Sequence, residues 1–160
     1  MPLNQAKIKE LGDALAPVEK NDLLKLTVKD SVQEAENYIS SAEKLKDKKD
    51  ADAKYRLSYE ACHMLLVCIL KTEGYQIDSK LGHRITLINL HPDLAPPSKP
   101  DYVERLSKAH FSRNRAAYGI SSPTSFTPSA ADKSTLADEL LEVAKDILTE
   151  TKIAIKPWLK

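Results

Sequence analysis

The stretch from residue 51 to residue 73 constrains this chain most, because it is apolar on two neighbouring faces of a helix. One stripe at helical spacing consists of Tyr55, Tyr59, Cys62, Leu66 and Ile69, and the stripe beside it of Ser58, Ala61, Leu65 and Cys68. A helix that is apolar over so wide an arc has to be covered on both faces. The sequence therefore predicts a central helix of a bundle, which ends before Gly74 at the C′ position.

The remaining apolar patterns also have helical spacing and predict an all-α fold, an up-and-down bundle of four to five helices. A second helix is expected from about Lys25 or Asp30 to Lys48, and a fourth from residues 99–101 to Gly119. A fifth begins near residue 131 or 132. Its apolar stripe consists of Leu136, Leu140, Val143, Ile147, Ala154 and Trp158.

The connections between these helices are polar or rich in proline. Residues 1–20 form an N-terminal arm, whose helix runs through Leu15 and stops at Pro17. The charged run 44–50 predicts a solvated turn, because aspartates interrupt its lysines. A short crossover helix is expected over residues 84–90, and the Ser, Thr and Pro content of residues 121–130 predicts a flexible loop.

The composition fits a single domain of 160 residues, with the arm at 1–20 and the bundle at 25–159. The net charge is +1, so binding of RNA would need a local basic patch, which oligomerisation can build. No apolar run approaches the roughly 20 residues of a membrane span, which predicts a cytoplasmic protein without membrane contact. Cys62 and Cys68 are then expected to be buried free thiols. No spacing indicates a cofactor or metal site, and the pair Cys62 and His63 has no further ligands nearby.

The fourth predicted helix ends in an unusually polar sequence, His110-Phe-Ser-Arg113-Asn114-Arg-Ala-Ala-Tyr118-Gly119. Residues four apart on a helix share a face, so Asn114 and Tyr118 are neighbours and His110 extends their stripe by one turn. Arg113 lies about 100° round the helix from Asn114. Its guanidinium offers a planar set of donors that suits a phosphate.

This sequence resembles the motif of the HEPN family (the "higher eukaryotes and prokaryotes nucleotide-binding" domain), an Arg, a polar residue, three further residues and a His. Residues 113–117 match its first five positions, and Tyr118 stands where the family has His. The helix from Tyr55 to Gly74-Tyr75, the following Gly82-His83 and the terminal helix over 136–159 are also similar to the family. The resemblance covers residues 27 to 159 and leaves the arm outside.

The resemblance implies a homodimer in which the two motifs face one cleft and, in active members, cleave RNA without a metal. The Arg would contact the scissile phosphate, and the His would transfer a proton or position the ribose hydroxyl. In this chain the candidate residues are Arg113, Asn114 and Tyr118, with His110 as a weaker candidate for the missing imidazole. A phenol, with a pKa near 10, is a poor general base at neutral pH.

Three interpretations stay open at this point. The motif is inert, with Arg113 paired to a carboxylate; or it cleaves RNA by altered chemistry; or it binds RNA or a nucleotide without cleavage. Because of Tyr118 we favour a HEPN-like dimeric domain that binds a nucleotide, RNA or a protein partner. The alternative is a metal-independent endoribonuclease of a toxin–antitoxin or phage-defence system. An antitoxin or a nucleotidyltransferase would then be its partner, and relatives suggest a Tyr near the motif as a nucleotidyl acceptor.

Overall fold

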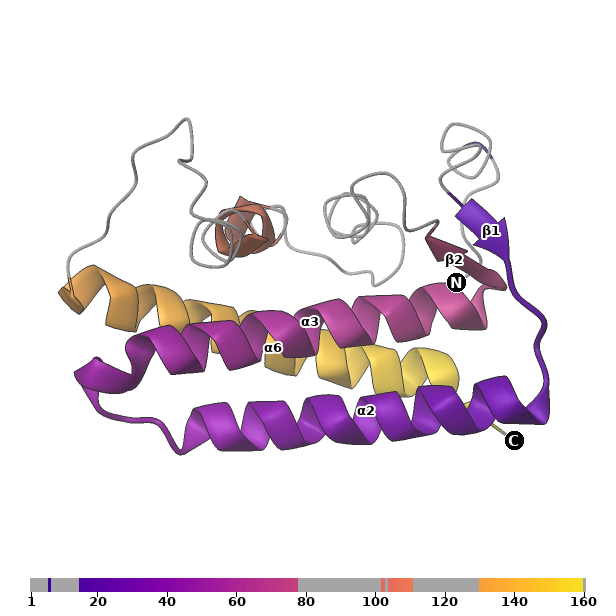
Figure 1. Ribbon diagram of the computed structural model, residues 1–160, viewed down its shortest axis with the longest axis horizontal. Helices are drawn as coiled ribbons and strands as arrows, with labels where there is room; N and C mark the ends of the chain where they lie inside the picture. The colour runs from indigo at the N-terminus through magenta and orange to yellow at the C-terminus, as the bar shows by residue number, and fades with distance from the viewer. Residues whose placement is uncertain (1–5, 7–14, 78–101, 103, 111–129, 160) are drawn as a thin grey trace.

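The structure is a computed structural model that describes residues 6, 15–77, 102, 104–110 and 130–159. The predicted all-α fold is confirmed (Figure 1). The labelled elements are β1 (Leu15–Pro17), α2 (Asp22–Glu43), the 3-10 turn η2 (Lys48–Asp50), α3 (Ala51–Thr72), β2 (Tyr75–Ile77) and α6 (Ala130–Ile155). A further helical segment comprises residues 104–110, with Tyr102 just before it also helical.

Helix α3 is the centre of the core, as its two apolar stripes predicted. Both stripes are buried against α2 and α6, apart from Tyr55, which is half-buried and packs on the edge of the core. The helix ends at Thr72, and Glu73 caps it. Gly74 follows at a φ of 93°, a left-handed conformation that glycine adopts without steric cost, and its N–H donates to the carbonyl of Lys71.

The three long helices lie alongside one another. Helices α2 and α3 run in opposite directions, and α6 runs parallel to α3 (Figure 1). Ion pairs between α2 and α6 have the register of an antiparallel pair, since Glu36 meets Lys152 whereas Glu43 lies 3.7 Å from Lys145. Segment 104–110 is seen nearly end-on in Figure 1, so it crosses α3 and α6 instead of running along them.

Helix α2 corrects the predicted bounds of the second helix. It begins at Asp22 rather than at Lys25 or Asp30, because the side-chain oxygen of Asn21 accepts a hydrogen bond of 2.9 Å from the N–H of Leu24. It ends at Glu43 instead of Lys48. The charged run that follows forms a turn, as predicted, and contains η2.

The residues before α2 are also corrected, since Leu15–Pro17 is a strand and not the end of an arm helix. β1 pairs with β2 in an antiparallel ribbon, in which Leu15 lies opposite Ile77 and Pro17 opposite Tyr75. The physical reason is burial, because Leu15 and Ile77 are only 9% and 6% exposed and join the edge of the core. The rest of the predicted arm helix lies outside the described residues, Ala6 excepted.

Helix α6 begins at Ala130, so the last residue of the expected loop 121–130 belongs to the helix. Leu140, Val143 and Ile147 of the predicted stripe are buried. Near the C-terminal end the buried positions are Thr151 and Ile155, while the predicted Ala154 is half-buried. The crossover helix 84–90, the expected start and end of the fourth helix and residues 121–129 lie outside the described part of the chain.

Both cysteines are free and buried, as predicted. Burial raises the pKa of Cys62 above its ordinary value and that of Cys68 to about 11. The Cys68 thiol lies 3.8 Å from the carbonyl oxygen of Val28 on α2 and donates a weak hydrogen bond to it. Both cysteines therefore pack as small residues of the core.

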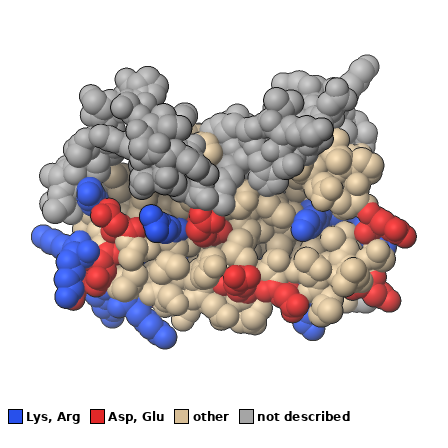
Figure 2. All heavy atoms as spheres, viewed as in Figure 1, with Lys and Arg blue, Asp and Glu red and all other residues tan. Residues whose placement is uncertain are grey.

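Charges of both signs are interspersed over the described surface in Figure 2, with lysines gathered at the end where α2 meets η2 and α3. These lysines alternate with Asp47 and Asp50, so the turn presents a mixed charge to solvent. Among the described helices, none combines the length and the apolar character that crossing a bilayer would require.

Candidate functional site

His110 is the one predicted site residue within the described part of the chain. It is the last residue of segment 104–110 and is half-buried. Arg113, Asn114 and Tyr118 lie outside the described residues, so their roles stay predictions. The structure does, however, describe how the helix that carries His110 is held against the bundle.

Segment 104–110 is anchored by its apolar side. Leu106 and Ala109 are 0% and 1% exposed and belong to the core formed with α3 and α6. At its N-terminal side the buried Tyr102 donates a hydrogen bond from its hydroxyl to the carboxylate of Asp146 on α6. Spacing of three to four residues puts Tyr102, Leu106 and Ala109 on one face. The segment is therefore fixed in both position and rotation.

His110 contacts α3 through a hydrogen bond with Tyr59. The Tyr59 hydroxyl oxygen and His110 Nδ1 are 3.1 Å apart, and the two ring centroids are 6.5 Å apart at an interplanar angle of 47°. Tyr59 is only 2% exposed, so its hydroxyl depends on partners within the protein. The contact fixes the orientation of the imidazole, because it adds a directed hydrogen bond to a tilted ring contact.

The sequence placed Tyr59 correctly in the core but did not predict its polar contact. Tyr59 and His110 are separated by 51 positions. Helical spacing orders residues on one helix and carries no information about which residue of another helix lies opposite. A buried tyrosine in an otherwise apolar stripe is the available signal, since its hydroxyl has to find a partner.

The other end of segment 104–110 lies beside carboxylates of α6. Asp146 accepts the bond from Tyr102, and Glu139 lies 4.0 Å from Arg105. Burial raises the pKa of Glu150, and the charge of nearby Asp146 raises it further. A phosphate near these groups would be repelled.

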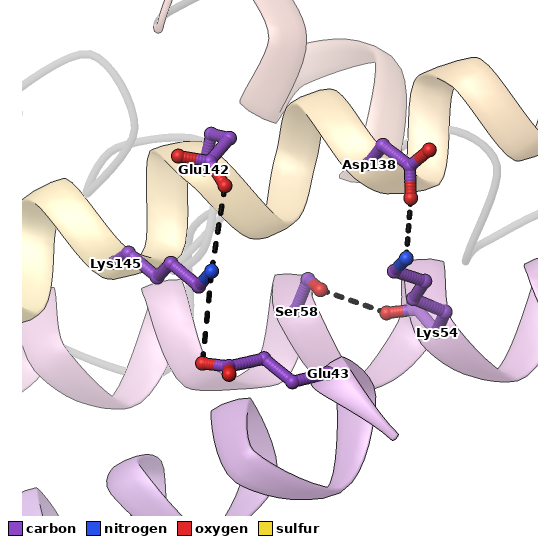
Figure 3. A network of polar contacts seen from close by, with 6 residues as sticks. All are labelled: Glu43, Lys54, Ser58, Asp138, Glu142 and Lys145. Carbon is purple, nitrogen blue, oxygen red and sulfur yellow. Dashed lines mark hydrogen bonds and ion pairs between the residues drawn. The ribbon is translucent and has the colours of Figure 1, made fainter. Parts of the chain in front are cut away.

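Several basic side chains of α3 and α6 are engaged in contacts between helices. Lys54 of α3 pairs with Asp138 of α6, while its backbone carbonyl accepts a 2.8 Å hydrogen bond from the buried Ser58 (Figure 3). Lys145 lies 3.4 Å from Glu142 and 3.7 Å from Glu43, so it bridges α6 and α2 (Figure 3). These lysines hold the helices together and are poorly suited to bind a phosphate.

Comparisons with protein-family models, with curated proteins and with solved structures found no match to this chain. Within the residues that the structure describes, three or more His, Cys, Asp or Glu side chains are nowhere grouped to hold a metal ion. The candidate site therefore consists of His110, the buried tyrosine that orients it, and the polar motif that follows His110 in the sequence.

Proposed function

We propose that this protein is a HEPN-like RNA-binding domain that works as a homodimer in the cytoplasm and holds RNA or a nucleotide without cleaving it. Arg113 and Asn114 would contact the phosphate and sugar. Tyr118, in the place of the motif His, supplies a hydrogen-bonding hydroxyl instead of a group that titrates near neutral pH. The all-α fold with a central α3 agrees with what the resemblance to that family implies.

The observation that carries this proposal is the way His110 is held. Its helical segment is fixed to the core by Leu106 and Ala109, and its ring is oriented by Tyr59 at 3.1 Å. A polar residue held in this way is suited to ligand recognition, because little side-chain entropy is lost when the ligand binds. The HEPN-like motif begins three positions after His110.

Binding of a fluorescein-labelled single-stranded RNA, followed by fluorescence anisotropy at low salt, tests the proposal. We expect Arg113→Ala to weaken binding about tenfold, because it removes a charge-assisted hydrogen bond to phosphate. Arg56→Ala is the matched control, since Arg56 is an exposed arginine of α3 outside the motif. Absence of binding by the unmodified protein, or equal effects of the two substitutions, would exclude the proposed role of the motif.

The homodimer has a separate test. A chain with a net charge of +1 gains a concentrated basic site by bringing the motifs of two copies together. Light scattering at micromolar concentrations should give twice the mass of one chain. A monomer would contradict this part of the proposal.

A protein partner, either an antitoxin or a nucleotidyltransferase, is tested by intact mass after co-expression, since a nucleotidyl group on Tyr118 would add its own mass.

A second candidate function is a metal-independent endoribonuclease of a toxin–antitoxin or phage-defence system. The observation that favours it is the oriented imidazole of His110, which lies eight positions before Tyr118 in the sequence and would replace the missing His. Incubation with total RNA in EDTA, beside Arg113→Ala, separates the two functions. Tyr118→His should create or raise cleavage if the site is catalytic, and should leave RNA intact if the site only binds.

A further inference from the structure

We infer that the end of the bundle where α2 begins and α6 ends is a docking surface for an anionic lipid bilayer. The inference goes beyond the proposed RNA-binding function and does not rest on it. The sequence predicted no membrane contact because no apolar run is long enough to span a bilayer, but a peripheral contact with one face needs no such run.

The exposed apolar side chains gather at this end. Among the described residues, the large apolar side chains that are exposed are Leu23, Leu26 and Ile153, with 71%, 55% and 69% of their surface accessible. Leu23 and Leu26 lie in the first two turns of α2, and Ile153 lies in the last turn of α6. Because α2 and α6 are antiparallel, these turns are at the same end of the bundle (Figure 1). Exposed apolar side chains that cluster in this way indicate a contact surface.

The charges along the boundary between α2 and α6 change at the same end. Glu43 and Glu36 are seven residues apart, so they lie on one side of α2, where they face Lys145 and Lys152 of α6. The next position of this series, seven residues before Glu36, is Lys29. The boundary thus begins with two ion pairs of opposite charge and then has a lysine where a carboxylate would be expected.

The α6 side of the boundary also has a lysine at this step. Lys156 lies four residues after Lys152 and therefore on the same face, and Lys25 shares the face of Lys29. The register of the ion pairs puts Lys156 opposite residue 32 of α2, about one turn from Lys29. Within the described part of the chain, Lys25, Lys29 and Lys156 have no ion pair. Their mutual repulsion would be relieved by an anionic partner.

Two exposed carboxylates, Asp22 and Asp30, lie on the same turns of α2. Asp22 is in the first turn, where its charge complements the positive end of the helix dipole. The three lysines outnumber these carboxylates, so this end keeps a positive charge beside its aliphatic side chains.

This combination of groups fits a bilayer better than RNA or a second copy of the chain. Anionic headgroups would neutralise the lysines, and the aliphatic side chains would enter the acyl region, as in helices that lie at the membrane interface. RNA would neutralise the lysines but is bound through aromatic stacking, which exposed leucines do not provide. A second copy on a two-fold axis would set the lysines against their own copies. Leu23, with 71% of its surface exposed, projects from the helix and suits insertion into a fluid layer.

Cosedimentation of the full chain with lipid vesicles tests the inference. We expect binding to vesicles of equal parts phosphatidylserine and phosphatidylcholine, weakened by added salt, and no binding to phosphatidylcholine alone. Changing Lys25, Lys29 and Lys156 together to Gln should weaken binding at least about tenfold. The matched control makes the same change at three exposed lysines of the opposite end, 44, 46 and 48, and should stay within about twofold of the unmodified protein. Equal losses for the two variants would overturn the inference.

A second experiment reports which face enters the bilayer. A polarity-sensitive fluorophore on Leu26→Cys should shift to shorter wavelength with anionic vesicles, whereas the same fluorophore on Ser41→Cys, near the other end of α2, should not. The native cysteines are buried and should take up little label. Leu26→Gln combined with Ile153→Gln should weaken vesicle binding about tenfold, because two aliphatic side chains no longer leave water. Equal fluorophore shifts at both positions would show that another face binds.

The remaining outcomes also decide the matter. Absence of binding to anionic vesicles, or equal binding to neutral ones, overturns the inference. If Leu26→Gln with Ile153→Gln turns a dimer into a monomer in light scattering, the apolar side chains form an interface between copies and the inference falls. If vesicles do not bind and the three-lysine variant loses labelled RNA as strongly as Arg113→Ala, the lysines belong to an RNA surface.

Failure of the inference and failure of the proposed function are distinguishable, because they are measured with different ligands. Vesicle binding without RNA binding leaves the inference standing and the proposed function wrong, and the reverse result does the opposite. Circular dichroism checks that each variant is folded.

Discussion

Replacing Leu66 with alanine should lower the free energy of unfolding by about 3–5 kcal/mol. Leu66 lies in the second half of α3 with 1% of its surface exposed, within the core between α2 and α6. The substitution removes three carbon atoms at roughly 0.8 kcal/mol each, or about 2.4 kcal/mol of transfer free energy. Because α3 is held on two faces, the cavity should collapse little. The rest of the predicted loss in the free energy of unfolding comes from this cavity, at about 24 cal/mol for each Å³ left empty.

Urea unfolding followed by circular dichroism measures this loss, provided that the transition is two-state and its slope is unchanged. Leu23→Ala is the matched control, because Leu23 lies in the first turn of α2 and is 71% exposed. It should change stability by less than about 0.5 kcal/mol. A loss below about 1 kcal/mol for Leu66→Ala, or equal losses for the two variants, would show that α3 is not the centre of the core.

Three further predictions concern a helix cap, a thiol and an anchor. Asn21→Ala should cost about 1 kcal/mol in urea unfolding because it removes the cap of α2, whereas Asn37→Ala, on the exposed face of the same helix, should stay within about 0.5 kcal/mol. Cys68 should react slowly with iodoacetamide in native buffer at pH 8, because burial raises its pKa to about 11 and leaves little thiolate; rapid labelling seen by mass spectrometry would contradict its placement. Tyr102→Phe should cost about 1.5–3 kcal/mol, since it removes the hydroxyl that donates to Asp146, and an unchanged urea midpoint would argue against this anchor.

The sequence predicted best what depends on periodicity within one helix. Tyr59, Leu65 and Leu66 could be assigned to the core because two stripes at helical spacing lay side by side. The predicted start of the second helix at Lys25 or Asp30 is too late, because Asn21 is the cap that begins the helix at Asp22. The same types of polar residue occur at the start of a helix and in a loop, and only the backbone geometry distinguishes the two.

Contacts between distant parts of the chain could not be predicted in this way. The strand Leu15–Pro17 has three residues, too few for an alternating pattern, and its partner is Tyr75–Ile77. The hydrogen bond between Tyr59 and His110 likewise joins separate helices. Of the candidate site residues, the sequence ranked His110 as the weaker one, and the structure shows that its ring is oriented by a contact with Tyr59. Arg113, Asn114 and Tyr118 stay predictions from the motif.

The β1–β2 ribbon should unfold locally while the helices of the bundle stay folded. Its pairing joins the two ends of the stretch 15–77, so it closes a long loop for the gain of a few backbone hydrogen bonds and the burial of Leu15 and Ile77. An isolated pair of such short strands is barely stable in water. The ribbon should therefore form late in folding, after α2 and α3 have docked, and its amides should exchange with deuterium well before those of α3.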